Sequence, residues 1–330
     1  MHRTFAPLLL LSSICLLSPL TASAVTITYS PVGHPGNAAD PADGDDDTAG
    51  IQNFGAVPYA YNIGTYGVTA GQYVEFLNAK DANGANPLRL YNSNMSNATY
   101  GGINFTLGNA NGSKYSVISG RGNHPANYVN WYDSIRFANW LNNGQGNGDT
   151  ETGAYTLGSL DADGKPTGGL SITRNPGAKV FLPSENEWYK AAYYNSDANS
   201  YFQYPTSSDT TPNATGPTAV PNSANYGNAV ANLTDAGAYT ETTSPYGAFD
   251  MGGNVFQWNE ALIGGSFRGL HGGSFATDSP GLLSTLRNNV LPSAESYQFG
   301  FRVASIPEPS TLVLAVVACG LIWVLRKPSK

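Results

Sequence analysis

Glycine and proline interrupt this chain so often that long regular elements are excluded. They account for 38 and 21 of its 330 residues. Because both residues mark turns, this density argues against a helical bundle. Hydrophobic residues make up 41% of the chain, with 20 tyrosines and 13 phenylalanines, which argues against bulk disorder. The sequence therefore predicts one or two globular domains with short elements and long ordered loops, held by packed aromatic residues or bound ions.

Charge and cysteine usage exclude several functions. The chain carries 16 Lys and Arg against 23 Asp and Glu, a net charge of −7, which argues against binding a nucleic-acid backbone. Its two cysteines, Cys15 and Cys319, lie in the terminal segments. Between residues 25 and 306 there is consequently no disulfide, thiolate nucleophile or cysteine-bound metal.

The first 24 residues have the pattern of a secretory signal peptide. His2 and Arg3 precede the apolar run Leu8–Leu11, and Ala22-Ser23-Ala24 forms a small-residue cleavage site. We expect cleavage after Ala24, so that the folded domain comprises residues 25–306.

The C-terminal segment combines three features in order. Pro307-Glu308-Pro309 is followed by an uncharged stretch from Thr311 to Leu325 and then by Arg326-Lys327. The stretch is short for a spanning helix, which needs about 20 apolar residues, although a simple C-terminal anchor is one interpretation. Residues 307–330 as a whole resemble the PEP-CTERM sorting signal with its hydrophobic helix. That resemblance implies a Gram-negative bacterium, export, transient anchoring in the inner membrane, cleavage by an exosortase-type enzyme, and release to the cell surface or medium.

Local patterns predict three helices. Thr69 with Gln72 and Ser184 with Glu187 form capping boxes, each at the start of a helix. A third helix begins near Asp133 and ends at Asn142-Asn143-Gly144. Short β-rich pieces lie between turns, so the pattern indicates a fold with little regular structure and long ordered loops. These predicted strands are residues 115–118, 154–157, 180–182, 272–275 and 299–303.

Several motifs resemble the formylglycine-generating enzyme, or sulfatase-modifying factor, superfamily. They occur in the family's order over roughly Tyr59 to Ala304. The resemblance implies a compact α+β variant of the C-type-lectin fold, low in regular structure. Most aromatic residues of the motifs, including Trp131, Trp188 and Trp258, are expected in the core. The motifs are residues 67–73, 125–141, 181–188, 246–258, 272–275, 287–288 and 300–302.

The resemblance also shows what the chain lacks. Family enzymes that use oxygen bind copper through two cysteines, and counting back from Arg287 places Ser279 and Ser284 at those positions. A serine hydroxyl does not replace a thiolate as a Cu(I) ligand, so copper is not expected. A second catalytic branch holds non-haem iron through histidines. Here His34, His124 and His271 lie in loop-like contexts, for which structural or surface roles are favoured.

Calcium is the remaining metal that the resemblance implies. The ligands would be the side chains of Asp250 and Gln257 and the carbonyl groups of Gly253 and Val255, which are hard oxygen donors of the kind calcium prefers. The alternative is a turn whose Asp and Asn bond their own backbone.

A second family calcium site would use Asn225 and the carbonyl group of Tyr226, with Asp235 as a candidate acidic partner. The acidic loop from Asp40 to Asp47 is interpreted as a solvated loop, with a calcium loop as the alternative.

Two functions remain open. The first is a non-catalytic binding or matrix module of the extracellular polysaccharide or biofilm layer, with polysaccharide or surface proteins as partners. Exposed tyrosine and asparagine side chains near a groove would suit sugar binding. The second is an oxidoreductase of the formylglycine-generating or non-haem-iron type with an unrecognised metal site. The missing cysteines favour the first.

Overall fold

The computed structural model describes residues 24–41 and 53–307, and the three predicted helices are confirmed. They are α1 (Ala70–Lys80), α2 (Trp131–Asn142) and α3 (Glu185–Tyr193). Each begins with a complete capping box, in which the residue before the helix and the third helical residue bond each other's backbone N–H groups. In α2 the capping residue is Asn130, which pairs with Asp133.

Two four-stranded sheets form the framework. The first has the order β1 (Tyr29–Val32), β2 (Tyr61–Gly64), β14 (Ala304–Ser305), β5 (Val180–Phe181), and its neighbours are antiparallel. The second has the order β12 (Asn288–Val290), β11 (Phe267–His271), β10 (Phe256–Ile263), β13 (Phe299–Phe301), and its β10–β13 pair is parallel.

Shorter elements complete the chain. Three strand pairs are β3 (Ile103–Phe105) with β4 (Tyr115–Val117), β6 (Tyr194–Asn195) with β7 (Ser200–Tyr201), and β8 (Asn213–Ala214) with β9 (Ser223–Ala224). Three 3₁₀ turns are η1 (Ser93–Ser96), η2 (Gly169–Ser171) and η3 (Ser279–Leu282).

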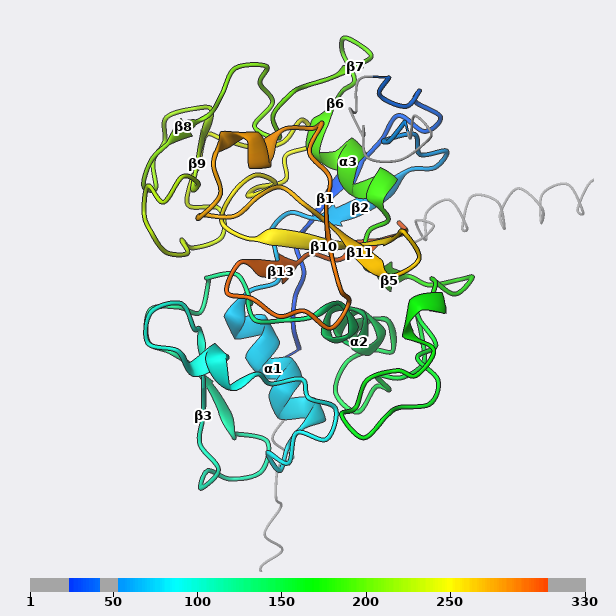
Figure 1. Ribbon diagram of the computed structural model, residues 1–330, viewed down its shortest axis with the longest axis vertical. Coiled ribbons are helices and arrows are strands. Elements are labelled where there is room, and N and C mark those ends of the chain that lie inside the picture. The colour runs from blue at the N-terminus through cyan, green and yellow to red at the C-terminus, as the bar shows by residue number, and fades with distance from the viewer. Residues whose placement is uncertain (1–23, 42–52, 308–330) are drawn as a thin grey trace, which may run out of the picture.

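The β10–β11 sheet lies between α2 and α3, with α1 beside α2 (Figure 1). Trp131, Trp188 and Trp258 are fully buried there, as expected for the family motifs. Each indole N–H donates within the core: Trp131 to the Asn259 carbonyl group at 2.9 Å, Trp188 to Gln257 Oε1 at 2.9 Å, and Trp258 to the Val129 carbonyl group at 3.0 Å. The core therefore buries large aromatic area without leaving these donors unpaired.

Two predicted strands are wrong. Residues 154–157 form no strand, and Tyr155 makes only an isolated bridge with Arg174. Residues 272–275 follow β11 without extending it, because Gly272 and Gly273 adopt positive φ values of 92° and 71° that turn the chain. The strands predicted near 115–118, 180–182 and 299–303 are present as β4, β5 and β13.

Several predictions concern segments outside the described residues. The signal peptide, the tail beyond residue 307 and Asp43 to Asp47 are among them. Of the acidic loop, Asp40 is described and buried, and its carboxylate accepts a hydrogen bond from the Tyr189 hydroxyl at 2.8 Å. Within the described ranges, no helix combines the length and apolar character required to cross a bilayer.

Candidate functional site

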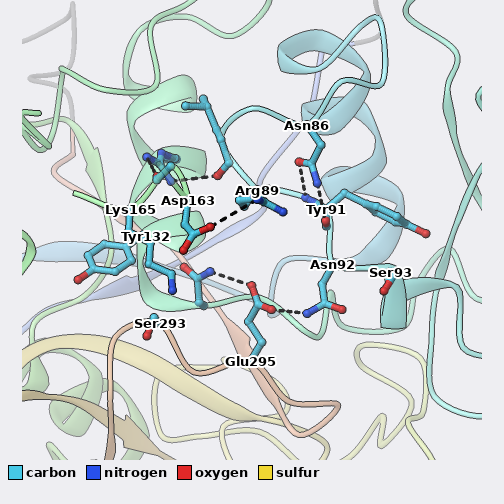
Figure 2. Close-up of a pocket in the computed structure, with 14 residues that line it drawn as sticks. Asn86, Arg89, Tyr91, Asn92, Ser93, Tyr132, Asp163, Lys165, Ser293 and Glu295 are labelled. Carbon is cyan, nitrogen blue, oxygen red and sulfur yellow. Dashed lines mark hydrogen bonds and ion pairs between the residues drawn. The ribbon is translucent and has the colours of Figure 1, made fainter. Parts of the chain in front are cut away.

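An open pocket of about 390 Å³ lies where the loop after α1 meets the start of α2 (Figure 2). Four separate stretches of chain contribute to it: residues 86–93, the first turns of α2 with Asn130, residues 163–165, and residues 293–295. Most of the lining side chains are amides, hydroxyls or charged groups. Its size is within the range of ligand pockets.

Glu295 is held on one side of this pocket by two neutral amides. Asn130 Nδ2 donates to one carboxylate oxygen at 2.9 Å, and Asn92 Nδ2 donates to the other (Figure 2). Each amide is itself fixed, because its oxygen caps a helical turn: Asn130 Oδ1 accepts from the Asp133 N–H at 3.0 Å, and Asn92 Oδ1 from the Asn94 N–H at 2.8 Å. The carboxylate therefore has a set orientation and is half-buried.

Cationic groups lie across from Glu295. Arg89 contacts Asp163 at 3.5 Å, and their side chains are 63% and 65% exposed (Figure 2). Lys165 is exposed beside them. Deeper in the wall, Arg136 donates through Nε and Nη2 to Glu151 at 2.8 and 3.1 Å.

The backbone of the pocket segment 86–93 is strained at two residues. Asn86 and Arg89 have φ values of 50° and 56°, in the left-handed region that non-glycine residues seldom adopt. The Asn86 side chain compensates by bonding both backbone groups of Tyr91, donating to its carbonyl group at 2.7 Å and accepting from its N–H at 3.1 Å. Strain of this kind concentrates at functional positions.

A second cluster brings together Glu185, His271 and Arg287, the residue that resembles the family's arginine. Arg287 donates to the Glu185 carboxylate through Nε at 2.8 Å and Nη2 at 2.7 Å, and His271 Nε2 lies 2.9 Å from the same carboxylate. Burial alone would raise the pKa of Glu185, but the hydrogen bonds and charges of His271 and Arg287 outweigh it and lower that pKa.

His271 is at the end of β11, not in a loop. Its ring stacks on Trp188 with centroids 5.1 Å apart, and its buried Nδ1 has no hydrogen-bond partner within residues 24–41 and 53–307. The cluster borders a smaller pocket of about 290 Å³ that Glu185, Arg287 and Glu260 help to line.

Of the two serines predicted at the family's cysteine positions, one is the first residue of η3 and the other follows that turn. Ser279 begins that turn and is half-buried. Ser284 is buried, and its N–H donates to the Gln203 carbonyl group at 2.9 Å. The expectation that copper is not bound stays a prediction.

The first predicted calcium loop surrounds the guanidinium group of Arg302. Arg302 is fully buried and donates to Gln257 Oε1, to the Gly64 carbonyl group at 2.7 Å and to the Phe249 carbonyl group at 2.8 Å. Gln257 Oε1 also accepts from the Trp188 indole at 2.9 Å, and Gln257 Nε2 donates to the Asp250 carbonyl group at 2.7 Å. Because both ends of the Gln257 amide are bonded within the protein, its side chain does not fit the role of a calcium ligand.

Asp250 has its own internal partner in that loop. One carboxylate oxygen accepts from the Gly237 N–H at 2.7 Å. Burial raises the pKa of Asp250, and the Gly237 hydrogen bond and the Arg302 charge offset part of that rise. Gly253 and Val255 lie in the same buried loop, with Gly253 at a φ of 79°.

The second predicted calcium position, at Asn225, is better suited to binding a cation. Asn225 is buried, and its Nδ2 donates to the Asn232 carbonyl group at 2.8 Å, but its Oδ1 has no hydrogen-bond partner among the described residues. An unpaired buried acceptor of this kind suits a cation ligand. Tyr226 follows directly, whereas Asp235 lies 3.6 Å from His124. Among residues 24–41 and 53–307, no three or more His, Cys, Asp or Glu side chains are grouped so that they could hold a metal ion.

Comparison with known proteins places the chain in a family. Residues 37–306 match the family described as "Sulfatase-modifying factor enzyme 1-like domain", and the protein belongs to it. No curated protein sequence matches the chain.

Solved structures show the same fold. Treponema denticola variable protein 1 is 23% identical with a TM-score of 0.55, over 88% of this chain and 100% of that one. The structure titled "Crystal Structure of CarF" is 20% identical with a TM-score of 0.50, over 86% and 99%. The predicted sulfatase-modifying-factor fold is thereby confirmed.

Sequence reasoning missed both charged clusters. The patterns named Arg287 as a family residue and Ser184–Glu187 as a capping box, but no spacing links Glu185 to His271 or Asn92 to Glu295. The asparagines at both helical caps were the only local signal near the larger pocket.

Proposed function

We propose that this protein is an exported, non-catalytic binding module of the extracellular polysaccharide layer, and that the pocket of Figure 2 is its glycan site. The observation that carries the proposal is the carboxylate of Glu295, oriented by Asn92 and Asn130 inside an open polar pocket. A fixed carboxylate with flanking amides offers acceptors and donors to neighbouring sugar hydroxyls. Serine at positions 279 and 284, in place of the copper-binding cysteines, supports a role without the family's oxygen chemistry.

The terminal segments extend this proposal. After export and removal of residues 1–24, the segment 307–330 holds the chain at the inner membrane until an exosortase-type enzyme cleaves it near Pro307-Glu308-Pro309. Mass spectrometry of protein released from the cell surface tests this step. Peptides from residues 312–330 in that fraction would contradict it.

Glycan binding is tested by affinity electrophoresis of the full-length protein through gels that contain soluble polysaccharides. We expect retardation of the wild type, and at least about tenfold weaker retention of Glu295→Gln, because a charge-assisted hydrogen bond is replaced by a neutral one. Glu241→Gln removes an exposed carboxylate outside the pocket and is the matched control. Equal retention of wild type and Glu295→Gln would reject the pocket as the site.

The alternative is an oxidoreductase of the formylglycine-generating or non-haem-iron type. The buried His271 favours it, since its Nδ1 is unpaired and its Nε2 contacts Glu185 next to Arg287. The metal content of the purified protein and oxygen-dependent oxidation of a cysteine peptide test this function. Bound copper or iron together with peptide oxidation that His271→Phe abolishes would replace the binding proposal.

A further inference from the structure

We propose that this pocket selects acidic sugars, binding a sugar carboxylate at Arg89 and Lys165 and the sugar hydroxyls at Glu295, an inference that rests on the proposed glycan binding. The first observation is the distribution of positive charge. Of the 12 Lys and Arg residues between 25 and 306, only Arg89, Lys165 and Lys179 are exposed. Two of these three line the pocket.

The pairing of Arg89 leaves it available to a ligand. In the part of the chain that the structure describes, its one ion pair, to Asp163, has a long N–O distance of 3.5 Å, with both side chains more than half exposed. Such a surface pair stabilises a fold by about 0–1 kcal/mol. A carboxylate that makes two parallel hydrogen bonds to the guanidinium group therefore competes well with Asp163. Lys165, in the same wall, adds a second positive charge for that ligand.

Glu295, on the other side of the pocket, further restricts the class of ligand that can bind. The carboxylate of Glu295 accepts hydrogen bonds but repels a second anion. A ligand for the whole pocket must therefore carry negative charge at one end and hydrogen-bond donors at the other. Ser93 and Ser293, which also line the pocket, contribute hydroxyl groups that both donate and accept. A uronic-acid residue, with one carboxylate and a ring of hydroxyls, has this distribution, whereas an acidic peptide side chain lacks the hydroxyls.

The test compares polygalacturonate with the same polymer after its carboxyl groups have been reduced to alcohols. Binding to the full-length protein is measured by titration calorimetry at low and at physiological salt. We expect polygalacturonate to bind at least about tenfold more tightly, and the double variant Arg89→Gln with Lys165→Gln to remove that preference while still binding the reduced polymer. The preference should also weaken as salt screens the exposed charges.

Lys179→Gln supplies the matched control, because it removes the third exposed cation outside the pocket and should leave the preference unchanged. Equal binding of both polymers would overturn the acidic-sugar inference and leave the glycan-binding function intact. Binding of neither polymer would reject both. Equally tight binding of polyglutamate, which carries the charge without hydroxyls, would replace the sugar with an acidic peptide.

Discussion

Arg89 and Arg302 carry the same side chain in opposite surroundings. Arg302 is fully buried in an array of carbonyl and amide oxygens, and burial lowers its pKa to about 10. Arg89 is 63% exposed and has one long contact with Asp163. The buried guanidinium holds three segments of the fold together, whereas the exposed one contributes little to stability. Burial and bonding therefore distinguish Arg302, a structural cation, from Arg89, which is available to a ligand.

Removing Arg302 tests the structural role of the buried guanidinium most directly. In Arg302→Met the carbonyl groups of Gly64 and Phe249 lose a buried donor, and each unsatisfied buried acceptor costs about 1–3 kcal/mol. We expect the free energy of unfolding to fall by about 4 kcal/mol when measured by urea denaturation. A loss below about 1 kcal/mol would show that water replaces the guanidinium in this cluster.

In burial, Arg287 is intermediate between Arg302 and Arg89, and it is hydrogen-bonded to the Glu185 carboxylate. Glu185→Gln should lower the free energy of unfolding at pH 7 by about 3 kcal/mol, because Arg287 and His271 lose their shared anion.

The pKa of Glu185 is lowered in the folded state, so its contribution is present above the ordinary value of 4.5 and is lost as pH falls through the folded-state pKa. The gap between wild type and Glu185→Gln should therefore narrow on acidification. Urea denaturation from pH 7 to pH 3 measures it, and a gap that stays constant would contradict the lowered pKa.

The two predicted calcium positions differ in whether their side-chain oxygens already have partners within the protein. Gln257 Oε1 is occupied by Arg302 and Trp188, whereas Asn225 Oδ1 is unpaired. Calcium at 100 times its dissociation constant should stabilise the wild type by about 2.7 kcal/mol, and Asn225→Ala should abolish that response.

Melting temperatures in millimolar calcium and in chelator check this calcium prediction, with Glu241→Gln as the control. If Asp250→Ala abolishes the response and Asn225→Ala does not, the ion binds beside Arg302 after all. If the wild type melts at one temperature in both solutions, neither position binds calcium.

The smallest effect is expected at Arg89. Arg89→Gln should change the free energy of unfolding by no more than about 0.5 kcal/mol, because exposed ion pairs stabilise folds weakly. The same urea titration measures it. A loss above about 2 kcal/mol would mean that Arg89 is a structural residue like Arg302.

Local signals predicted the three helices and three of the strands, but not how the strands pair. Each helix start is encoded within four residues, as in Ser184 to Glu187, so it is readable from sequence. Strand pairing is not local: β14 pairs with β2 about 240 residues earlier, and two-residue strands carry no detectable alternation.

The candidate site was hidden for the same reason. Glu295 is 203 residues from Asn92 and 165 from Asn130, and only folding brings them together. The family motifs located the Asp250–Gln257 loop, but they did not reveal that Arg302 fills it, because carbonyl partners leave no trace in a sequence.

The position of β14 in the sequence also determines when the first sheet can be completed during synthesis. Its two residues lie between β2 and β5 and pair with both, so the first sheet is split until residues 304–305 are available. A ribosome adds residues at about 5–20 per second, and the chain leaves its exit tunnel from the N-terminus onward. For nearly all of its synthesis this domain therefore lacks the strand that joins β1 and β2 to β5. The completed first sheet therefore forms only after the full domain has been made.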